Sequence, residues 1–149
     1  VTMFQPLALA FYLAGEETCL YHMRTEPDPF DRALKALTQT CTDFARAALA
    51  EGADGIFYSA RFGSYEVMSE AEYNRFARPY DLAVLDAAGK GWLNVLHVHG
   101  RYPMVKLLAD YPAQVMNWHD RTTPPSLAEA MMACVLADAK LRHRGQTGR

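Results

Sequence analysis

Short β-favouring runs alternate with longer helix-favouring runs along the chain, and this alternation restricts the fold more than any other feature. The predicted strands fall at 1–6, 53–63, 92–100 and 113–120, and the predicted helices at 6–17, 26–52, 69–91, 102–112 and 125–144. Strands that alternate with helices are typical of a parallel sheet with helical crossovers. Four such units are half of the eight that close a barrel of about 250 residues. The sequence therefore predicts an α/β fold, either a partial (β/α)8 TIM-type barrel of about four βα units or a small open sheet.

Local signals predict where the helices begin and break. Asp28 as an N-cap with Pro29 at the first helical position predicts the start of the longest helix. Ser69 and Glu72 have the spacing of a capping box. Pro79 is expected to end or kink the helix in which it lies, because proline lacks the amide hydrogen that continues the hydrogen-bond ladder.

Composition bounds the class of protein. The 15 basic and 17 acidic residues give a formal net charge of −2, so no overall field attracts nucleic acid or an anionic membrane. Three distant cysteines without a Cys-x-x-Cys pair favour a reducing compartment. The apolar start lacks a basic leader and is interrupted by Gln5 and Pro6, so it predicts a strand and a helix. We expect a cytoplasmic protein that binds neither nucleic acid nor membrane, with one domain over 1–141 and a flexible tail at 142–149.

Polar side chains gather where the predicted strands end. In parallel α/β folds, functional residues collect at the carboxyl ends of the strands. The strand-end residues with polar or ionisable side chains are Ser59, Arg61, His97, His99, Asn117, His119, Asp120 and Arg121. Their convergence predicts a functional site at this edge of the sheet.

The two histidines in the run "LHVHG" are the strongest metal candidates. His97 and His99 are two positions apart on a strand, so their side chains share a face with Cα atoms ~6.6 Å apart. Two imidazoles can supply half of a zinc site, for which His119 or Asp120 on the next strand is the nearest third ligand. The alternative is that one histidine bonds a backbone carbonyl while the other is solvated.

The remaining candidates have ordinary alternatives. Arg61 and Arg121 could hold substrate carboxylates bidentately, or could be solvated loop charges. For Tyr12, one turn into the first predicted helix, the alternative is a core tyrosine with a solvated hydroxyl. Trp92 and Trp118 are predicted to be core residues.

The run "FARAALAEGADGIFYSARFG…MSEAEYNRFARPYDLAVLDAAG…NVLHVHG…VMNWH" resembles the uroporphyrinogen decarboxylase superfamily of (β/α)8 barrels. This superfamily includes the haem-pathway decarboxylase and zinc-dependent methyltransferases that move methyl groups from corrinoid proteins to thiols. The resemblance extends from "PLALAFYLAG" to "SLAEA". It implies that this chain is the middle of a longer barrel.

The resemblance also implies roles for individual residues. Tyr12 and Ser59 correspond to a tyrosine and a serine of the decarboxylase cleft, and are its implied catalytic residues. Asn117 replaces an aspartate of the decarboxylase pattern. His97 corresponds to the first histidine of the methyltransferase His-x-Cys zinc motif, where His99 replaces the cysteine and could still bind zinc.

Three functions remain open from the sequence. The first is a decarboxylase-like fragment whose parent enzyme acts on a tetrapyrrole polycarboxylate without a cofactor, with Arg61, Asn117, His119 and Arg121 as substrate-binding residues. The second is a zinc-dependent methyltransferase-like protein whose partner is a methyl-corrinoid protein. The third is a non-catalytic half-barrel that associates with itself, as a homodimer, to cover its free sheet edges.

Overall fold

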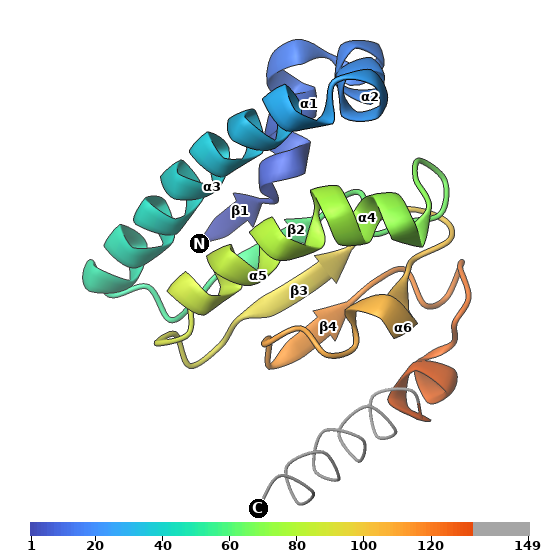
Figure 1. The fold of residues 1–149 in the computed structure, drawn as a ribbon. Coiled ribbons are helices and arrows are strands. Elements are labelled where there is room, and N and C mark those ends of the chain that lie inside the picture. The colour runs from blue at the N-terminus through green and yellow to red at the C-terminus, as the bar shows by residue number, and fades with distance from the viewer. Residues whose placement is uncertain (133–149) are drawn as a thin grey trace, which may run out of the picture.

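A computed structural model of the chain describes residues 1–132, which form one parallel sheet covered by helices (Figure 1). The strands are β1 (Thr2–Phe4), β2 (Phe57–Ala60), β3 (Val95–Val98) and β4 (Val115–Asn117). They lie in the order β1-β2-β3-β4, and each pairs in parallel with the next. This confirms the prediction of an α/β fold that is part of a TIM-type barrel.

Six helices connect the strands. They are α1 (Pro6–Ala14), α2 (Glu16–Thr25), α3 (Pro27–Ala50), α4 (Glu70–Phe76), α5 (Arg78–Ala87) and α6 (Val105–Leu108). Residues 127–132 begin a further helix, where Ser126 and Glu129 bond each other in capping-box fashion. No helix within residues 1–132 is both long and apolar enough to cross a membrane. The rest of the predicted last helix and the tail at 142–149 lie outside the described residues.

The helix boundaries confirm two of the local predictions and correct one. Ser69 and Glu72 form the predicted capping box at the start of α4. The helical segment that contains Pro79 is interrupted at Ala77, where α4 gives way to α5. The prediction that Asp28 caps the longest helix was wrong, because α3 already begins at Pro27 and its first turn includes Asp28.

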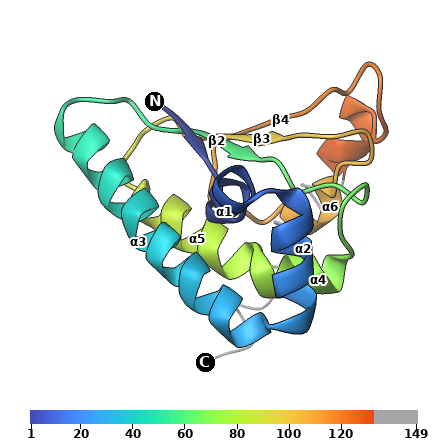
Figure 2. The ribbon, with the colours of Figure 1, turned by 90° about the horizontal axis from the view of Figure 1, so that it is seen from above.

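The two faces of the sheet differ. Figure 2 shows the helices packed on one face, where alternate strand residues such as Met3, Tyr58 and Leu96 are buried. On the opposite face, Phe4 and Phe57 remain 42% and 38% exposed. In a complete barrel this second face would be the interior. The described residues thus form an open half of a barrel whose inner face is accessible.

The two tryptophans have different surroundings. Trp118, directly after β4, is buried as predicted, and its indole N–H donates to the Pro125 carbonyl at 2.9 Å. Trp92 was predicted to be a core residue, and this was wrong, because it is 68% exposed. It precedes β3 rather than lying within it, and its indole N–H donates to Asp54 at 2.7 Å.

Candidate functional site

Three histidines meet at the carboxyl edge of the sheet. His97 lies on β3, His99 follows the last residue of that strand, and His119 lies two residues beyond β4. Each offers a ring nitrogen within 4.8 Å of the other two. The parallel pairing of β3 with β4 places both strand ends at this edge, and this brings residues 20 positions apart together. His119 is thereby the third member of the cluster that His97 and His99 begin.

His97 is held from two sides. Its Nδ1 atom lies 2.6 Å from Oδ1 of Asn117, its partner in the register of β3 and β4. Its ring stacks on Phe57 of β2, with ring centroids 5.4 Å apart. The half-buried His97 ring is therefore restrained, whereas His99 and His119 are exposed.

One row of open-face residues crosses the whole sheet at the level of the cluster. Phe4, Ser59, His97 and Asn117 are successive register partners on β1, β2, β3 and β4. Tyr58 points into the helix layer, so by strand alternation Ser59 faces the same side as His97. Ser59 is only 8% exposed. The predicted site residues Ser59 and Asn117 thus flank His97.

Arg61 and Tyr12 lie together beside this row. The guanidinium of Arg61 is 5.0 Å from the centre of the Tyr12 ring, a cation–π contact. The Tyr12 ring in turn contacts Phe4 edge to face at 5.3 Å. Tyr12 is 51% exposed and has no core role. Tyr12 and Arg61, predicted from different segments, therefore adjoin the histidine row.

The pKa of His99 is lowered from its ordinary value. Partial burial is the main cause, and His97, the positive charge of Arg61 and His119 add to it, while Glu66 opposes them. A lowered pKa keeps the imidazole neutral at neutral pH, and the neutral form is the one that binds metal. The involvement of Arg61 also shows that its charge lies close enough to His99 to act on it.

The turn after β4 carries two predicted site residues, His119 and Arg121, whose surroundings differ. His119 joins the cluster, and its backbone carbonyl accepts hydrogen bonds from Thr122 and Thr123. Arg121 is exposed in the same turn. Within residues 1–132 its side chain makes no hydrogen bond or ion pair, and its substrate contact stays a prediction.

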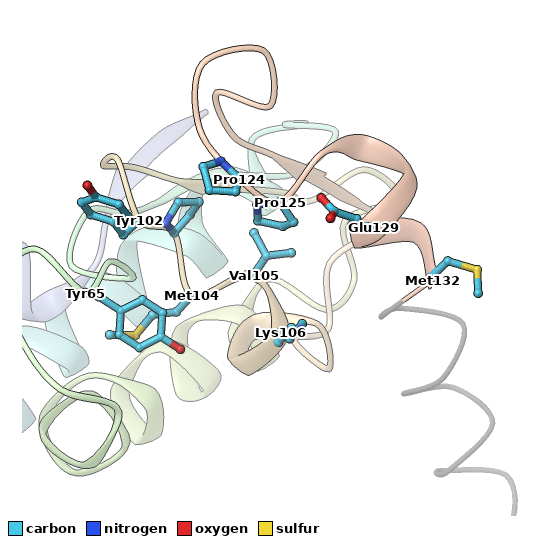
Figure 3. A pocket seen from close by; sticks show the side chains of 10 residues that line it. Tyr65, Tyr102, Met104, Val105, Lys106, Pro124, Pro125, Glu129 and Met132 are labelled. Carbon is cyan, nitrogen blue, oxygen red and sulfur yellow. The ribbon is translucent and has the colours of Figure 1, made fainter.

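A cavity of about 640 Å³ opens among the segments that follow β2, β3 and β4 (Figure 3). Its lining is largely apolar and consists of Tyr65, Tyr102, Pro103, Met104, Val105, Lys106, Pro124, Pro125, Glu129 and Met132. None of the predicted site residues lines it. Volume alone therefore does not mark the site of chemistry, and the histidine cluster is the better candidate.

A buried polar cluster that the sequence did not predict lies on the helix side of the sheet. Asp81 of α5 and Gln5 after β1 are both completely buried and hydrogen bonded to each other. The sequence feature that could have revealed Asp81 is an acidic residue on the apolar side of a predicted helix. The feature that could have revealed Gln5 is a polar residue at the end of a predicted strand.

The fold and the site define a class: a parallel α/β half-barrel with three imidazoles grouped at the carboxyl ends of its strands. Residues 1–137 match the family Uroporphyrinogen decarboxylase (URO-D), and the chain belongs to this family. A methyltransferase from Methanosarcina mazei has a similar fold, with a TM-score of 0.78 and 19% sequence identity over 89% of this chain. The chain spans 39% of that methyltransferase.

One further similarity is short. A stretch of 22 residues is 91% identical to the chorismate synthase of Hyphomonas neptunium, and covers 15% of this chain and 6% of that protein. So small a share of either chain supports no inference about fold or activity.

Proposed function

We propose that this chain carries the metal site of a zinc-dependent URO-D family enzyme that transfers a methyl group to a thiol. The observation that supports this function above the others is the cluster of His97, His99 and His119, with ring nitrogens within 4.8 Å of one another. A methyl-corrinoid protein is the donor partner that we propose. The similar fold of the M. mazei methyltransferase agrees with this choice.

The donor set fits zinc. Three imidazoles and one open position are a known ligand set of catalytic zinc, with Zn–N distances of about 2.0–2.1 Å. Tetrahedral geometry at those distances separates the nitrogens by about 3.3 Å, so small side-chain rotations would bring all three onto one ion. A bound zinc ion would lower the pKa of a thiol at its open position and so favour the nucleophilic thiolate.

The protein's own residues prepare the site for an anionic substrate. Asn117 and Phe57 hold the His97 ring in place. Arg61 is half-buried and lies over Tyr12, so its orientation is restrained. A guanidinium in such a place can hold a carboxylate or thiolate group of the substrate. Ser59, next to His97 in the register, offers a hydroxyl on the same face.

Metal analysis tests this function. Protein purified without chelator should contain one equivalent of zinc, and His97→Ala, His99→Ala and His119→Ala should each lose most of it. His22→Ala is the matched control, because His22 is a partly exposed histidine on α2 that pairs with Glu26 and lies outside the cluster. Absence of zinc from the unaltered protein, even after incubation with zinc salt, would exclude the proposal.

A second candidate, a decarboxylase fragment that needs no metal, has its own supporting observation. The Arg61 guanidinium over the Tyr12 ring brings a cation and a phenol together at the open face, where a polycarboxylate could bind. In this case zinc-free protein should bind a tetracarboxylate porphyrinogen, and Arg61→Ala should abolish that binding. Arg46→Ala is the control, since Arg46 is an exposed residue of α3 that pairs with Asp43.

A third candidate is a self-associating half-barrel. Its support is the open sheet face and the two outer strands, where Phe4 on β1 and Val115 on β4 are 42% and 44% exposed. A second copy could cover these edges in a symmetric homodimer. Light scattering would then show a dimer that Val115→Lys dissociates, whereas a monomer at high protein concentration would rule it out.

A further inference from the structure

Asp81 is a buried carboxylate surrounded by tyrosines. Its Oδ1 accepts a hydrogen bond from Tyr58 at 2.6 Å, and its Oδ2 accepts from Tyr73 at 2.6 Å and from Tyr111 at 3.0 Å. The three tyrosines come from β2, α4 and the segment after α6, and Asp81 belongs to α5, so four parts of the chain meet at one side chain. A buried carboxylate is unfavourable unless it is hydrogen bonded, so the donors around Asp81 are needed to stabilise it in this position.

Both carboxyl oxygens of Asp81 accept hydrogen bonds, as those of a carboxylate do. Desolvation raises its pKa to about 6, while the hydrogen bonds from Tyr58, Tyr73, Tyr111 and Gln5 oppose that rise. An ionised carboxylate only accepts hydrogen bonds. Every group that faces Asp81 must therefore present a donor.

This requirement fixes the orientation of Gln5. A glutamine side chain has a donor end and an acceptor end that are nearly the same in shape. In Gln5, Nε2 donates to Asp81 Oδ1 at 3.4 Å, and Oε1 accepts from the backbone N–H of Phe62 at 2.7 Å. With the opposite orientation, two donors would face each other at Phe62, and Asp81 would face an oxygen.

The Phe62 amide belongs to the turn that carries Arg61. The turn is closed by the Gly63 N–H, which donates to the Ala60 carbonyl at 3.1 Å, so Arg61 and Phe62 are its two central residues. The Phe62 ring is buried against Phe11, with centroids 4.3 Å apart. Anchoring the Phe62 amide and ring leaves Arg61 pointing to the open face beside Tyr12.

We propose that Asp81 is a positioning residue that acts through Gln5 to hold the Arg61 turn beside the histidine cluster. The inference rests on the proposed function in one respect, namely that Arg61 meets the substrate at this edge. Asp81 itself is buried on the helix side of the sheet, opposite the open face. Its role is to select the one Gln5 orientation that satisfies the turn.

Hydrogen exchange of the Phe62 amide tests the link directly. In Asp81→Asn and in Gln5→Leu, protection of the Phe62 amide should fall about tenfold relative to that of Val95, as expected for one lost hydrogen bond at a buried amide. Val95 is the reference because its N–H donates to the Ile56 carbonyl at 2.8 Å, in the sheet but away from Gln5. The upfield ring-current shift of the Arg61 side-chain protons, which lie over two aromatic rings, should shrink in the same variants.

The control variant is Tyr80→Phe, which removes a tyrosine hydroxyl from the same helix where it bonds Asp31 instead of Asp81. This variant should leave unchanged the ratio of the protection of the Phe62 amide to that of the Val95 amide. Tyr111→Phe removes one donor to Asp81 and should lower the ratio by a smaller factor, which keeps the test available if Asp81→Asn does not fold. If Asp81→Asn lost protection equally at both amides, or left the ring-current shift of the Arg61 protons unchanged, Asp81 would have a structural role only and would not position Arg61. Failure of the proposed function would be seen separately, as absence of zinc from the unaltered protein.

Discussion

The Nδ1 atom of His97 and the Oδ1 atom of Asn117 are 2.6 Å apart across the register of β3 and β4. An amide oxygen only accepts hydrogen bonds, so Nδ1 of a neutral His97 donates and Nε2 keeps its lone pair. Ligand histidines commonly bond a neighbour through the nitrogen that does not bind metal. Asn117 thus has a role in orienting His97, in addition to the substrate contact that the sequence predicts for it.

Asn117→Ala should weaken zinc binding about 10- to 100-fold, the usual effect of removing the hydrogen-bond partner of a ligand histidine. Competition with a chromophoric chelator measures the dissociation constant. Asn117→Asp is the matched control, because a carboxylate oxygen also accepts from Nδ1 and should keep the affinity near that of the unaltered protein. Unchanged affinity in Asn117→Ala would contradict an orienting role.

Zinc should stabilise the folded protein against heat. A ligand that binds only the native state at 100 times its dissociation constant adds about 2.7 kcal/mol, which raises Tm by several degrees for a domain of this size. Differential scanning fluorimetry with and without zinc measures the shift, and excess EDTA should reverse it. His99→Ala should lose most of the shift. An equal shift in that variant would mean that zinc binds elsewhere.

The stability contribution of Asp81 should depend on pH with a definite sign. Burial raises its pKa from 3.8 to about 6, so the folded protein binds this proton more tightly than the unfolded chain. The contribution is therefore fully present below about pH 3.8 and is lost as pH rises through about 6. The loss amounts to about 3 kcal/mol, at 1.36 kcal/mol for each pKa unit.

Urea unfolding at a series of pH values checks this. Because Asp81→Asn cannot ionise, the stability of the unaltered protein relative to this variant should decline between pH 4 and pH 7. Tyr80→Phe should show no such trend relative to the unaltered protein. A relative stability that rises with pH would mean that the hydrogen bonds of the tyrosines outweigh the burial of the Asp81 carboxylate.

The sequence predicts the fold well because periodicity and capping are local. The alternation of strands and helices, the capping box at Ser69 and the break near Pro79 all depend on residues close in the chain. Errors arose where the outcome depends on a choice among similar local signals or on tertiary contacts. Two prolines near the start of α3 allowed two N-termini, and Trp92 is apolar yet lies outside its strand.

The site was predictable only in part, because the ends of the strands can be predicted from local patterns whereas the partners of the side chains depend on tertiary contacts. Strand-end logic brings His97, His99 and His119 to one edge, because parallel strands end together. It says nothing about side-chain partners, so the bond from His97 to Asn117 and the contact of Arg61 with Tyr12 could not be foreseen. The link from Asp81 to Gln5 joins residues 76 positions apart, and no local pattern encodes it.

Gly55, before β2, provides a last test of the sheet geometry. A Cβ at this position would lie 2.0 Å from the backbone oxygen of Leu93, which no side-chain adjustment can relieve. Gly55→Ala should therefore destabilise the protein by about 3 kcal/mol or more, at or beyond the upper end of ordinary overpacking. Gly89→Ala is the comparison, because its Cβ would lie 3.0 Å from the Asp86 oxygen and a smaller shift suffices. Urea unfolding measures both, and equal losses would contradict the close approach of the segments before β2 and β3.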